Sequence, residues 1–346
     1  MTEATVPPAH PQVAHLQATH PQAAHLQADV AIVGGGIVSS SAALFLRRHG
    51  LSVVLLERGR CGAAASGVNC GGVRVQGRSL VQLPLALRAR QLWAQLPALI
   101  GMDGEYQQTG HLKLARSDAD IASLQHYARL VDGQGLGLQL ISGQAFRRAY
   151  PWLGGRAIAG SWCPGDGHAN PRLVSPAFAR AAQAAGARVI EGCEVTELAH
   201  NGSRFVLGNG QGLLVQAPWL LNCAGAWALP VARALGDDAP LHSIHPGMAV
   251  TEPLPQFMAI NIGVEGGGIY GRQTARSNCV MGGSRGASTG PAVGEALAHW
   301  VHLGRAGVPL APFAISRFSN LHVSNDHARP AHHATAALSS APTLHP

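Results

Sequence analysis

Residues 29–50, DVAIVGGGIVSSSAALFLRRHG, restrict the fold of this chain more than any other stretch. A short apolar run comes first, then three consecutive glycines, then an apolar and serine-rich run that ends in two arginines. This order predicts a β-strand, a tight turn and an α-helix. A second apolar run, LSVVLLE, follows at once and ends in Glu57. The stretch therefore predicts a parallel strand–helix–strand crossover, the unit from which doubly wound sheets are built.

The turn matches a dinucleotide-binding fingerprint at two of its three glycine positions. Gly34 permits the tight turn, and Gly36 has no side chain, so the backbone can approach a pyrophosphate at the helix N-terminus. Ser39 stands where the third glycine is expected, and its hydroxyl is expected to bond locally to the backbone at a cost of about 1 kcal/mol or less. Glu57 lies near the spacing of a carboxylate that accepts ribose hydroxyls. Any strand, glycine turn and helix shares part of this pattern, and nicotinamide and flavin dinucleotides share all of it.

Composition disfavours several other classes of protein. The chain has 346 residues, 47% of them apolar and 12% charged, which is enough for a sizeable core. The formal net charge is +7, but the arginines are scattered and Lys113 is the single lysine, so we expect no nucleic-acid partner. None of the six cysteines forms a C-x-x-C pair, which favours free buried thiols in the cytoplasm and no metal site. We expect no signal peptide and no stable membrane insertion, because residues 30–46 carry the glycines and serines of a buried strand and helix.

The two ends of the chain differ in character from its middle. A near-perfect repeat, HPQVAHLQAT followed by HPQAAHLQAD, predicts a disordered tail over residues 1–28, and a polar His/Pro/Ala-rich stretch predicts another over 319–346. Short alternating runs near 204–215 and 244–285 are typical of antiparallel strands. Helix-like runs cover residues 38–49, 80–96, 117–132, 171–185 and 290–303. We therefore expect an α/β fold, with a Rossmann-like nucleotide domain into which a mainly antiparallel sheet is inserted.

Segments downstream of Glu57 narrow the choice of nucleotide. ERGRCGAAASGVNCGGVR is a long loop of small residues that can wrap a flat ring system, GDGHANPRLVSPAFARAAQAAGARVIEG gives a loop, a helix and a strand, and WLLNCAGAWA gives a further strand and turn. In this order they resemble the FAD-dependent amine and amino-acid oxidoreductases, which include D-amino-acid oxidase, glycine oxidase and the sarcosine oxidase beta-subunit. The resemblance runs from Asp29 to about Gly286 and resumes over residues 290–318, which are similar to the family's closing segment.

This resemblance implies FAD as the cofactor and assigns residues to it. It places Gly34, Gly36, Ser39 and Glu57 around the adenosine diphosphate portion, Ser66, Asn69, Gly71 and Gly72 beside the flavin ring, Val195 near the adenine, and Ala224, Gly225 and Trp227 in a second cofactor turn. The implied reaction is oxidation of the carbon–nitrogen bond of a small amine or amino acid of glycine, sarcosine, D-amino-acid or opine type. The product is an imine, and a hydride passes to flavin N5. The electron acceptor is left open among oxygen, a quinone and a partner subunit.

The resemblance also implies a substrate site in the inserted sheet. Tyr270 matches the tyrosine with which family members meet the substrate carboxylate, and Arg272 follows two residues later on the same strand face, where it offers a charged fork. The alternative is that Tyr270 is a half-buried strand aromatic and Arg272 a charge at the rim. His168 and His245 lie in the family-like motifs GHANP and IHPG, and we expect both to be turn histidines satisfied by the backbone.

Residues 282–297 depart from the family pattern. The family has several dozen more residues here, including a final parallel strand and a glycine-rich turn over the flavin, so the sequence indicates an internal deletion near 287–290 or a shifted reading frame. A lost strand would expose a sheet edge. An inactive remnant or a non-catalytic flavin-fold subunit is therefore one alternative. A nicotinamide-dependent dehydrogenase is another, disfavoured by the loop at 58–74 and by NCAGAW.

These patterns together predict a discontinuous organisation. The expected segments are a tail over 1–28, the first part of the FAD-binding domain over 29–80, the first part of the substrate domain over 81–160, the second part of the FAD-binding domain over 161–240, the second part of the substrate domain over 241–286, a truncated remnant of the C-terminal FAD-domain segment over 287–318, and a tail over 319–346.

Overall fold

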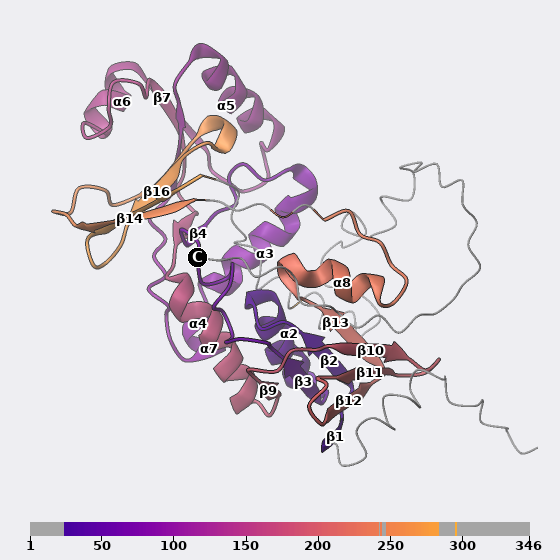
Figure 1. Cartoon of the computed structure of the whole chain (residues 1–346). Helices are drawn as coiled ribbons and strands as arrows, with labels where there is room; N and C mark the ends of the chain where they lie inside the picture. Colours follow the sequence, from indigo (N-terminus) through magenta and orange to yellow (C-terminus); the bar gives the residue numbers. More distant parts are fainter. Residues whose placement is uncertain (1–23, 242, 244–246, 284–294, 296–346) are drawn as a thin grey trace, which may run out of the picture. The chain divides into compact units, whose positions relative to one another are not determined.

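The computed structural model describes residues 24–241, 243, 247–283 and 295 (Figure 1). These residues divide into two compact units. Of the described residues, the first unit contains 24–61, 182–241, 243 and 295, and the second contains 62–181 and 247–283. The expected deletion near 287–290, the helix over 290–303 apart from residue 295, His245 and the C-terminal tail lie outside the described residues.

A parallel four-stranded sheet forms the centre of the first unit, in the order β13-β2-β3-β9. Its strands are β2 (Val30–Val33), β3 (Val53–Leu56), β9 (Arg188–Ile190) and β13 (Trp219–Asn222). The runs VAIV and VVLL are buried along their whole length, as is typical of parallel strands covered on both faces. Helix α2 (Ile37–Arg48) connects β2 to β3, so the predicted crossover is confirmed.

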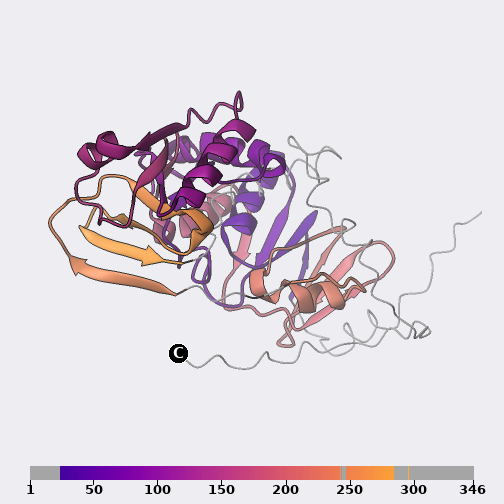
Figure 2. The same cartoon turned by 90° about the horizontal axis from the view of Figure 1, so that it is seen from above.

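A second four-stranded sheet packs against the first in the same unit (Figure 2). Its strands, in order, are β1 (Ala24–Gln27), β12 (Leu213–Ala217), β11 (Phe205–Gly208) and β10 (Glu197–His200). The pairs β10–β11 and β11–β12 are antiparallel, as predicted. Val54 and Leu56 of β3 share an apolar core with Leu207 and Val215, so burial of apolar side chains holds the two sheets together.

The N-terminal boundary differs from the predicted one. Strand β1 pairs in parallel with β12, and Ala28 is buried. The prediction that the tail extends to residue 28 is therefore wrong for residues 24–28. The repeat in the sequence hid this strand, because its pairing partner lies almost two hundred residues further along the chain.

The second unit is built on a seven-stranded sheet in the order β14-β17-β16-β15-β5-β7-β6. Its strands are β5 (His111–Ala115), β6 (Gln139–Ser142), β7 (Ala159–Cys163), β14 (Met248–Pro253), β15 (Asn261–Val264), β16 (Tyr270–Gln273) and β17 (Asn278–Gly282). The pair β15–β5 is parallel and the other pairs of this sheet are antiparallel, which agrees with the expected mainly antiparallel sheet.

Helices and a short hairpin complete the second unit. The elements are the 3-10 helices η1 (Leu80–Gln82) and η3 (Glu265–Gly267), the helices α3 (Leu83–Trp93), α4 (Leu96–Ile100), α5 (Asp118–Leu130) and α6 (Gly143–Ala149), and the paired strands β4 (Gly72–Val73) and β8 (Gly167–His168). The helix predicted over 80–96 is present as η1 and α3, which follow one another directly, but it ends at Trp93. Pro97 in α4 lacks the amide that would continue the helix. Helix α7 (Pro171–Ala184) crosses the division between the units.

The division between the units also differs from the predicted boundaries. It falls after Cys61 and after Ala181, instead of at residues 80 and 160. Hydrogen bonds explain the first shift: the amides of Val75 and Gln76 donate to the carboxylate of Asp166, at 2.7 and 3.0 Å. The stretch after Cys61 therefore belongs with the hairpin and the large sheet. Periodicity does not reveal such long-range bonds.

Candidate functional site

The glycine-rich turn of the first unit has a geometry that demands glycine. Gly34 adopts φ 102°, and its amide donates to the Leu56 carbonyl at 2.8 Å. A Cβ atom on Gly34 would lie 2.4 Å from the carbonyl oxygen of Cys223, at the end of the neighbouring strand β13. Gly36 is the N-cap residue of α2, with extended backbone. The turn therefore leads directly into a helix N-terminus, the arrangement that binds phosphates.

Gly35, which the fingerprint leaves free, is also restricted to glycine. Its Cβ would lie 2.7 Å from Cys61 Sγ and 2.8 Å from Glu57 Cγ. The Gly35 amide donates to Glu57 Oε2 at 2.5 Å, and the Gly59 amide donates to Oε1 at 2.7 Å. The carboxylate is thus fixed beside the turn, and its two oxygens keep lone pairs for ribose hydroxyls. The middle one of the three consecutive glycines, Gly35, was the signal for this contact in the sequence.

Ser39 fits the turn without strain. Its side chain is fully buried, and its hydroxyl donates to the Gly36 carbonyl at 2.8 Å. This local bond satisfies the hydroxyl in the way the sequence predicts. Ser40 and Ser41 are also buried, and their hydroxyls donate to the Gly35 and Ile37 carbonyls. The serine in the third fingerprint position therefore leaves close packing of α2 intact.

A second turn follows strand β13. Ala224 is the N-cap residue of the 3-10 helix η2 (Gly225–Trp227), and Gly225 adopts φ 59°. The order of the sheet places the ends of β13 and β3 on either side of β2, and so on either side of the glycine turn. The Arg58 guanidinium lies 3.8 Å from the Trp227 ring centroid, an interaction that the sequence did not reveal. Helix α8 (Ala228–Arg233) begins directly after η2.

Val195 is placed differently from these residues. Its side chain is 7% exposed and belongs to the apolar core that joins the two sheets of the first unit. Its predicted position near the adenine stays a prediction.

The loop before β4 in the second unit is shaped by Asn69. Its side-chain amide donates to the Ala65 and Ser66 carbonyls at 3.0 Å, and its Oδ1 accepts from the Gly71 amide at 2.8 Å. Gly71 adopts φ 75°, and its Cβ would lie 2.1 Å from the Ala169 carbonyl oxygen. Asn69 and Gly71 therefore act as structural residues of this loop.

Gly72, in contrast to Gly71, has open space on the side where a Cβ atom would lie. Among the described residues, no atom lies within 4 Å of the position that a Cβ on Gly72 would take. The backbone is therefore accessible on this side, as contact with a flat ring would require.

Arg272 has a structural role that the sequence did not predict, because two of its guanidinium donors bond to backbone carbonyls. The residue is 5% exposed, Nε donates to the Cys70 carbonyl, and Nη2 donates to the Ala169 carbonyl at 3.1 Å. The alternative of a rim charge is wrong because the residue is buried. Sequence spacing placed Arg272 correctly on β16 but gave no sign of its backbone partners.

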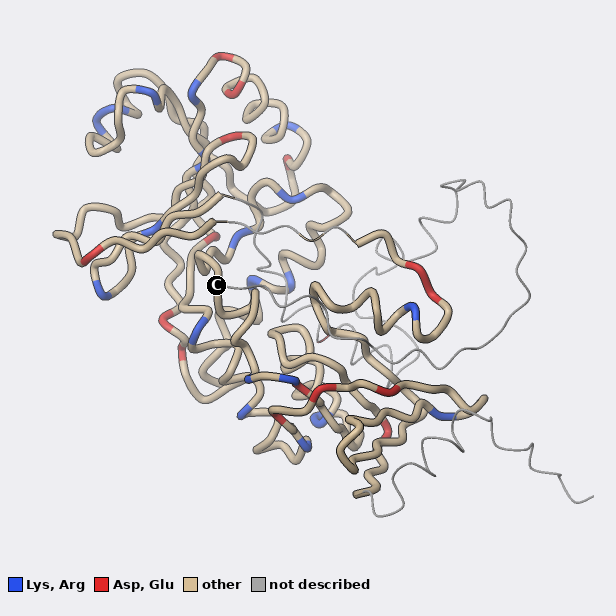
Figure 3. Tube along the Cα trace, viewed as in Figure 1, with Lys and Arg blue, Asp and Glu red and all other residues tan. Residues whose placement is uncertain are grey.

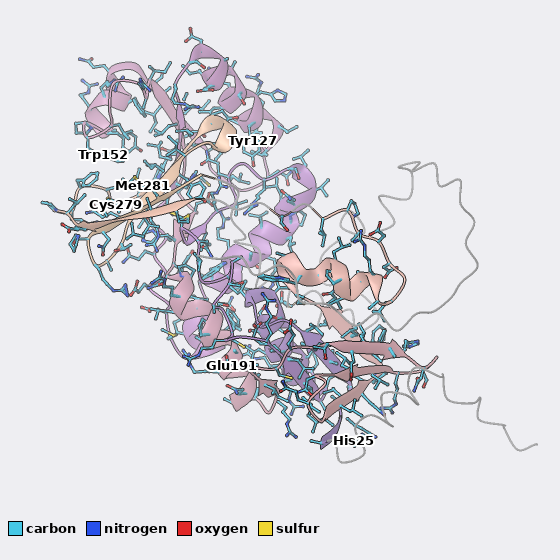
Figure 4. All side chains as sticks on the ribbon, viewed as in Figure 1. His25, Tyr127, Trp152, Glu191, Cys279 and Met281 are labelled. Carbon is cyan, nitrogen blue, oxygen red and sulfur yellow. The ribbon has the colours of Figure 1, made fainter. Side chains whose placement is uncertain are left out.

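Tyr270, two residues earlier on β16, keeps a weakly engaged hydroxyl. Among the described residues, the acceptor recorded for it is the Met248 thioether, at 3.7 Å. Met248 also lines a hollow of about 410 Å³ in the second unit. The other lining residues are Gly247, Ala249, Gly268, Ile269, Met281, Gly282 and Gly283. Met281 is labelled in Figure 4, and it lies on β17 with Cys279. A thioether is a weak acceptor, so this hydroxyl can turn to a better one.

His168 lies on β8 and is buried. Its backbone exchanges two hydrogen bonds with Gln107, and its Nδ1 lies 3.3 Å from the Thr109 hydroxyl. Burial, with a smaller contribution from the charge of Arg272, lowers the pKa of the imidazole to about 4. The expected turn histidine satisfied by the backbone is therefore wrong in two respects, because His168 lies on a strand and its ring bonds to the Thr109 side chain.

The described residues hold no group of three or more histidine, cysteine or acidic side chains that could bind a metal ion. All six cysteines are free thiols. Figure 3 shows basic and acidic residues interspersed along the described part of both units. No helix in the described part of the chain is long and apolar enough to span a bilayer.

Comparison with known proteins decides which dinucleotide the turn serves. The family described as FAD dependent oxidoreductase matches residues 29–319. The chain belongs to this family. Its cofactor is therefore FAD, and the glycine turn, the fixed Glu57 carboxylate and the α2 N-terminus fit the adenosine diphosphate portion of that group.

Individual members of the family give the extent of the similarity. Glycine oxidase from Geobacillus kaustophilus is 31% identical over 217 residues, which cover 60% of this chain and 57% of that protein. Human mitochondrial sarcosine dehydrogenase is 30% identical over 233 residues, which cover 65% of this chain and 25% of that protein. The chain thus matches from a quarter to little more than half of these relatives' lengths.

Solved structures confirm the fold class. The crystal structure of glycine oxidase from Geobacillus kaustophilus aligns with a TM-score of 0.74 and 21% identity, covering 84% of this chain and 99% of that one. L-proline dehydrogenase from P. horikoshii aligns with a TM-score of 0.76 and 19% identity, covering 86% of this chain and 99% of that one.

Proposed function

We propose that this member of the FAD dependent oxidoreductase family oxidises the carbon–nitrogen bond of a small amino acid with a primary or N-methylated amine. The observation that carries the proposal is the glycine turn, because its backbone and the fixed Glu57 carboxylate suit the cofactor that defines the family. The two curated relatives are named for glycine and for sarcosine, which is N-methylglycine. FAD, when bound, supplies the acceptor for the hydride lost from the carbon next to nitrogen.

Residues of the second unit are proposed to orient the flavin ring and the amino-acid substrate. Ser66, Asn69, Gly71 and Gly72 belong to the segment proposed to lie beside the flavin ring, and the open side of Gly72 supports this position. Tyr270 is proposed to donate its hydroxyl hydrogen to the substrate carboxylate in place of the Met248 thioether. A phenol and a carboxylate form a stronger hydrogen bond than a phenol and a thioether, since one partner is ionised.

Reduction by substrate tests this function. The purified full-length protein is loaded with FAD, freed of oxygen, and mixed with glycine, sarcosine, proline or a D-amino acid while the flavin absorbance is recorded. We expect at least one of them to bleach the flavin.

We expect Tyr270→Phe to raise the half-saturating amino-acid concentration about tenfold, since one hydrogen bond to a charged group is lost. For methylamine, which has no carboxylate, the half-saturating concentration should be the same in the wild type and in Tyr270→Phe. A bound flavin that none of the amino acids reduces would contradict the proposed activity.

A second function is favoured by one relative. The mouse pyruvate dehydrogenase phosphatase regulatory subunit is 28% identical over 232 residues. A regulatory subunit among the relatives supports the alternative of a non-catalytic flavin-fold protein. The same experiment separates the two, because a protein that binds FAD and is reduced by dithionite but by no amine fits this alternative.

A further inference from the structure

Arg272 joins three segments of the second unit. It projects from β16, its Nε donates to the carbonyl of Cys70 in the loop before β4, and its Nη2 donates to the carbonyl of Ala169 directly after β8. These partners lie 202 and 103 residues away in the sequence. A single side chain therefore ties β16 to the residues that flank both strands of the short hairpin.

The charge of this guanidinium is buried. Arg272 is 5% exposed, and among the described residues it makes no ion pair within 4.0 Å of an acidic side chain. Glu105, whose charge acts on it from further away, is paired with the exposed Arg276 instead. Burying an arginine is costly, and here the compensation on record is the pair of carbonyl acceptors. Loss of those two bonds would leave both carbonyls and the charge unsatisfied.

Gly71 lies at the centre of this arrangement. Its Cβ would be 2.1 Å from the Ala169 oxygen and 3.1 Å from Arg272 Nη2. The Ala169 amide donates to the Gly71 carbonyl at 2.9 Å, and the Gly71 amide donates to Asn69 Oδ1 at 2.8 Å. Gly72 follows directly and pairs with His168. The position of its open face is therefore set by the Arg272 bonds on one side of it and by the hairpin on the other.

We propose that Arg272 is a positioning residue that holds the backbone of residues 70–72 in place for the flavin ring and does not bind the substrate carboxylate. The proposal rests on the proposed function for the place of the cofactor. Its mechanical part, the fixing of residues 70–72 by the guanidinium, is a property of the second unit alone. This separation allows the two parts to be tested independently.

The mechanical part is tested by amide hydrogen exchange on FAD-free protein. Arg272→Gln should accelerate exchange at least tenfold at the Gly71 and Ala169 amides. The shorter, uncharged glutamine side chain cannot donate to both carbonyls. Arg272→Lys should fall between wild type and Gln. Arg276→Gln, which removes an exposed arginine in the turn after the same strand, should leave these amides unchanged. Unchanged exchange in a folded Arg272→Gln protein would overturn the proposal, whether or not FAD binds. If Arg272→Gln does not fold, unchanged exchange in Arg272→Lys would overturn it.

The functional part is tested by cofactor affinity and substrate kinetics. We expect the dissociation constant of FAD to rise at least tenfold in Arg272→Gln and less in Arg272→Lys, with Arg276→Gln as the control. The loss of flavin reduction rate should be the same for an amino acid and for methylamine. A higher KM for the amino acid alone, with unchanged FAD affinity, would instead assign Arg272 to the substrate. Failure of the wild-type protein to react with amines would contradict the proposed function, but it would not affect the conclusion from the exchange experiment.

Discussion

Replacing Gly34 by alanine should lower the free energy of unfolding of the first unit by about 3 kcal/mol and abolish FAD uptake, because strained backbone and a clash act together. At φ 102° an L-residue is strained, and the new Cβ would lie 2.4 Å from the Cys223 oxygen. That oxygen belongs to the backbone, so it cannot move aside without shifting the end of β13. Urea denaturation followed by circular dichroism measures the stability, and a flavin titration measures the uptake.

Gly50→Ala is the matched control for this substitution. Gly50 lies after α2 in the same unit with φ 83°, but no described atom lies within 4 Å of its Cβ position. We expect a cost of about 1 kcal/mol there, from the left-handed backbone alone, and unchanged FAD affinity. Equal losses of stability in both variants would show that the close approach to Cys223 has no energetic role.

Gly71→Ala should weaken folding, whereas Gly72→Ala should weaken FAD binding. In FAD-free protein, Gly71→Ala should lower the free energy of unfolding by about 3 kcal/mol, since its Cβ would meet the Ala169 oxygen and its φ is 75°. Gly72→Ala should change it by no more than about 0.5 kcal/mol, because the added methyl group enters open space. The FAD dissociation constant should nevertheless rise about tenfold in Gly72→Ala, which corresponds to roughly 1.4 kcal/mol of binding energy.

The comparison of these two neighbours separates folding from cofactor contact. Both variants are measured by thermal unfolding without FAD and by flavin titration. Wild-type FAD affinity in Gly72→Ala would contradict the proposal that the ring lies against this face. A stable Gly71→Ala protein would contradict the described packing of the loop on Ala169.

Sequence reasoning found the parts of the site that are local in the chain. The roles of Gly34 and Gly36 follow from a strand, a turn and a helix that are consecutive, and Glu57 ends the next strand. The Ser39 hydroxyl bonds to a carbonyl three residues away, so its compensation was also predictable. Local geometry determines each of these, and a single sequence contains it.

The contacts that the sequence did not reveal join distant segments. Arg58 stacks on Trp227, and Asp166 accepts the amides of Val75 and Gln76. Arg272 is the clearest case, because its guanidinium donates to two carbonyls that lie more than a hundred residues away in the sequence. Strand β1 was missed for the same reason, since its pairing depends on β12 and its own composition is that of a polar repeat.

The central claim is that the turn at Gly34–Gly36 and the carboxylate of Glu57 serve the dinucleotide of FAD. The most direct measurement is a titration of FAD-free full-length protein with FAD, followed by flavin absorbance and fluorescence, with excess NAD as competitor. We predict saturable binding of one FAD per chain that NAD does not displace, and weaker binding in Glu57→Gln. Absence of saturable FAD binding, or displacement of FAD by NAD, would contradict the account.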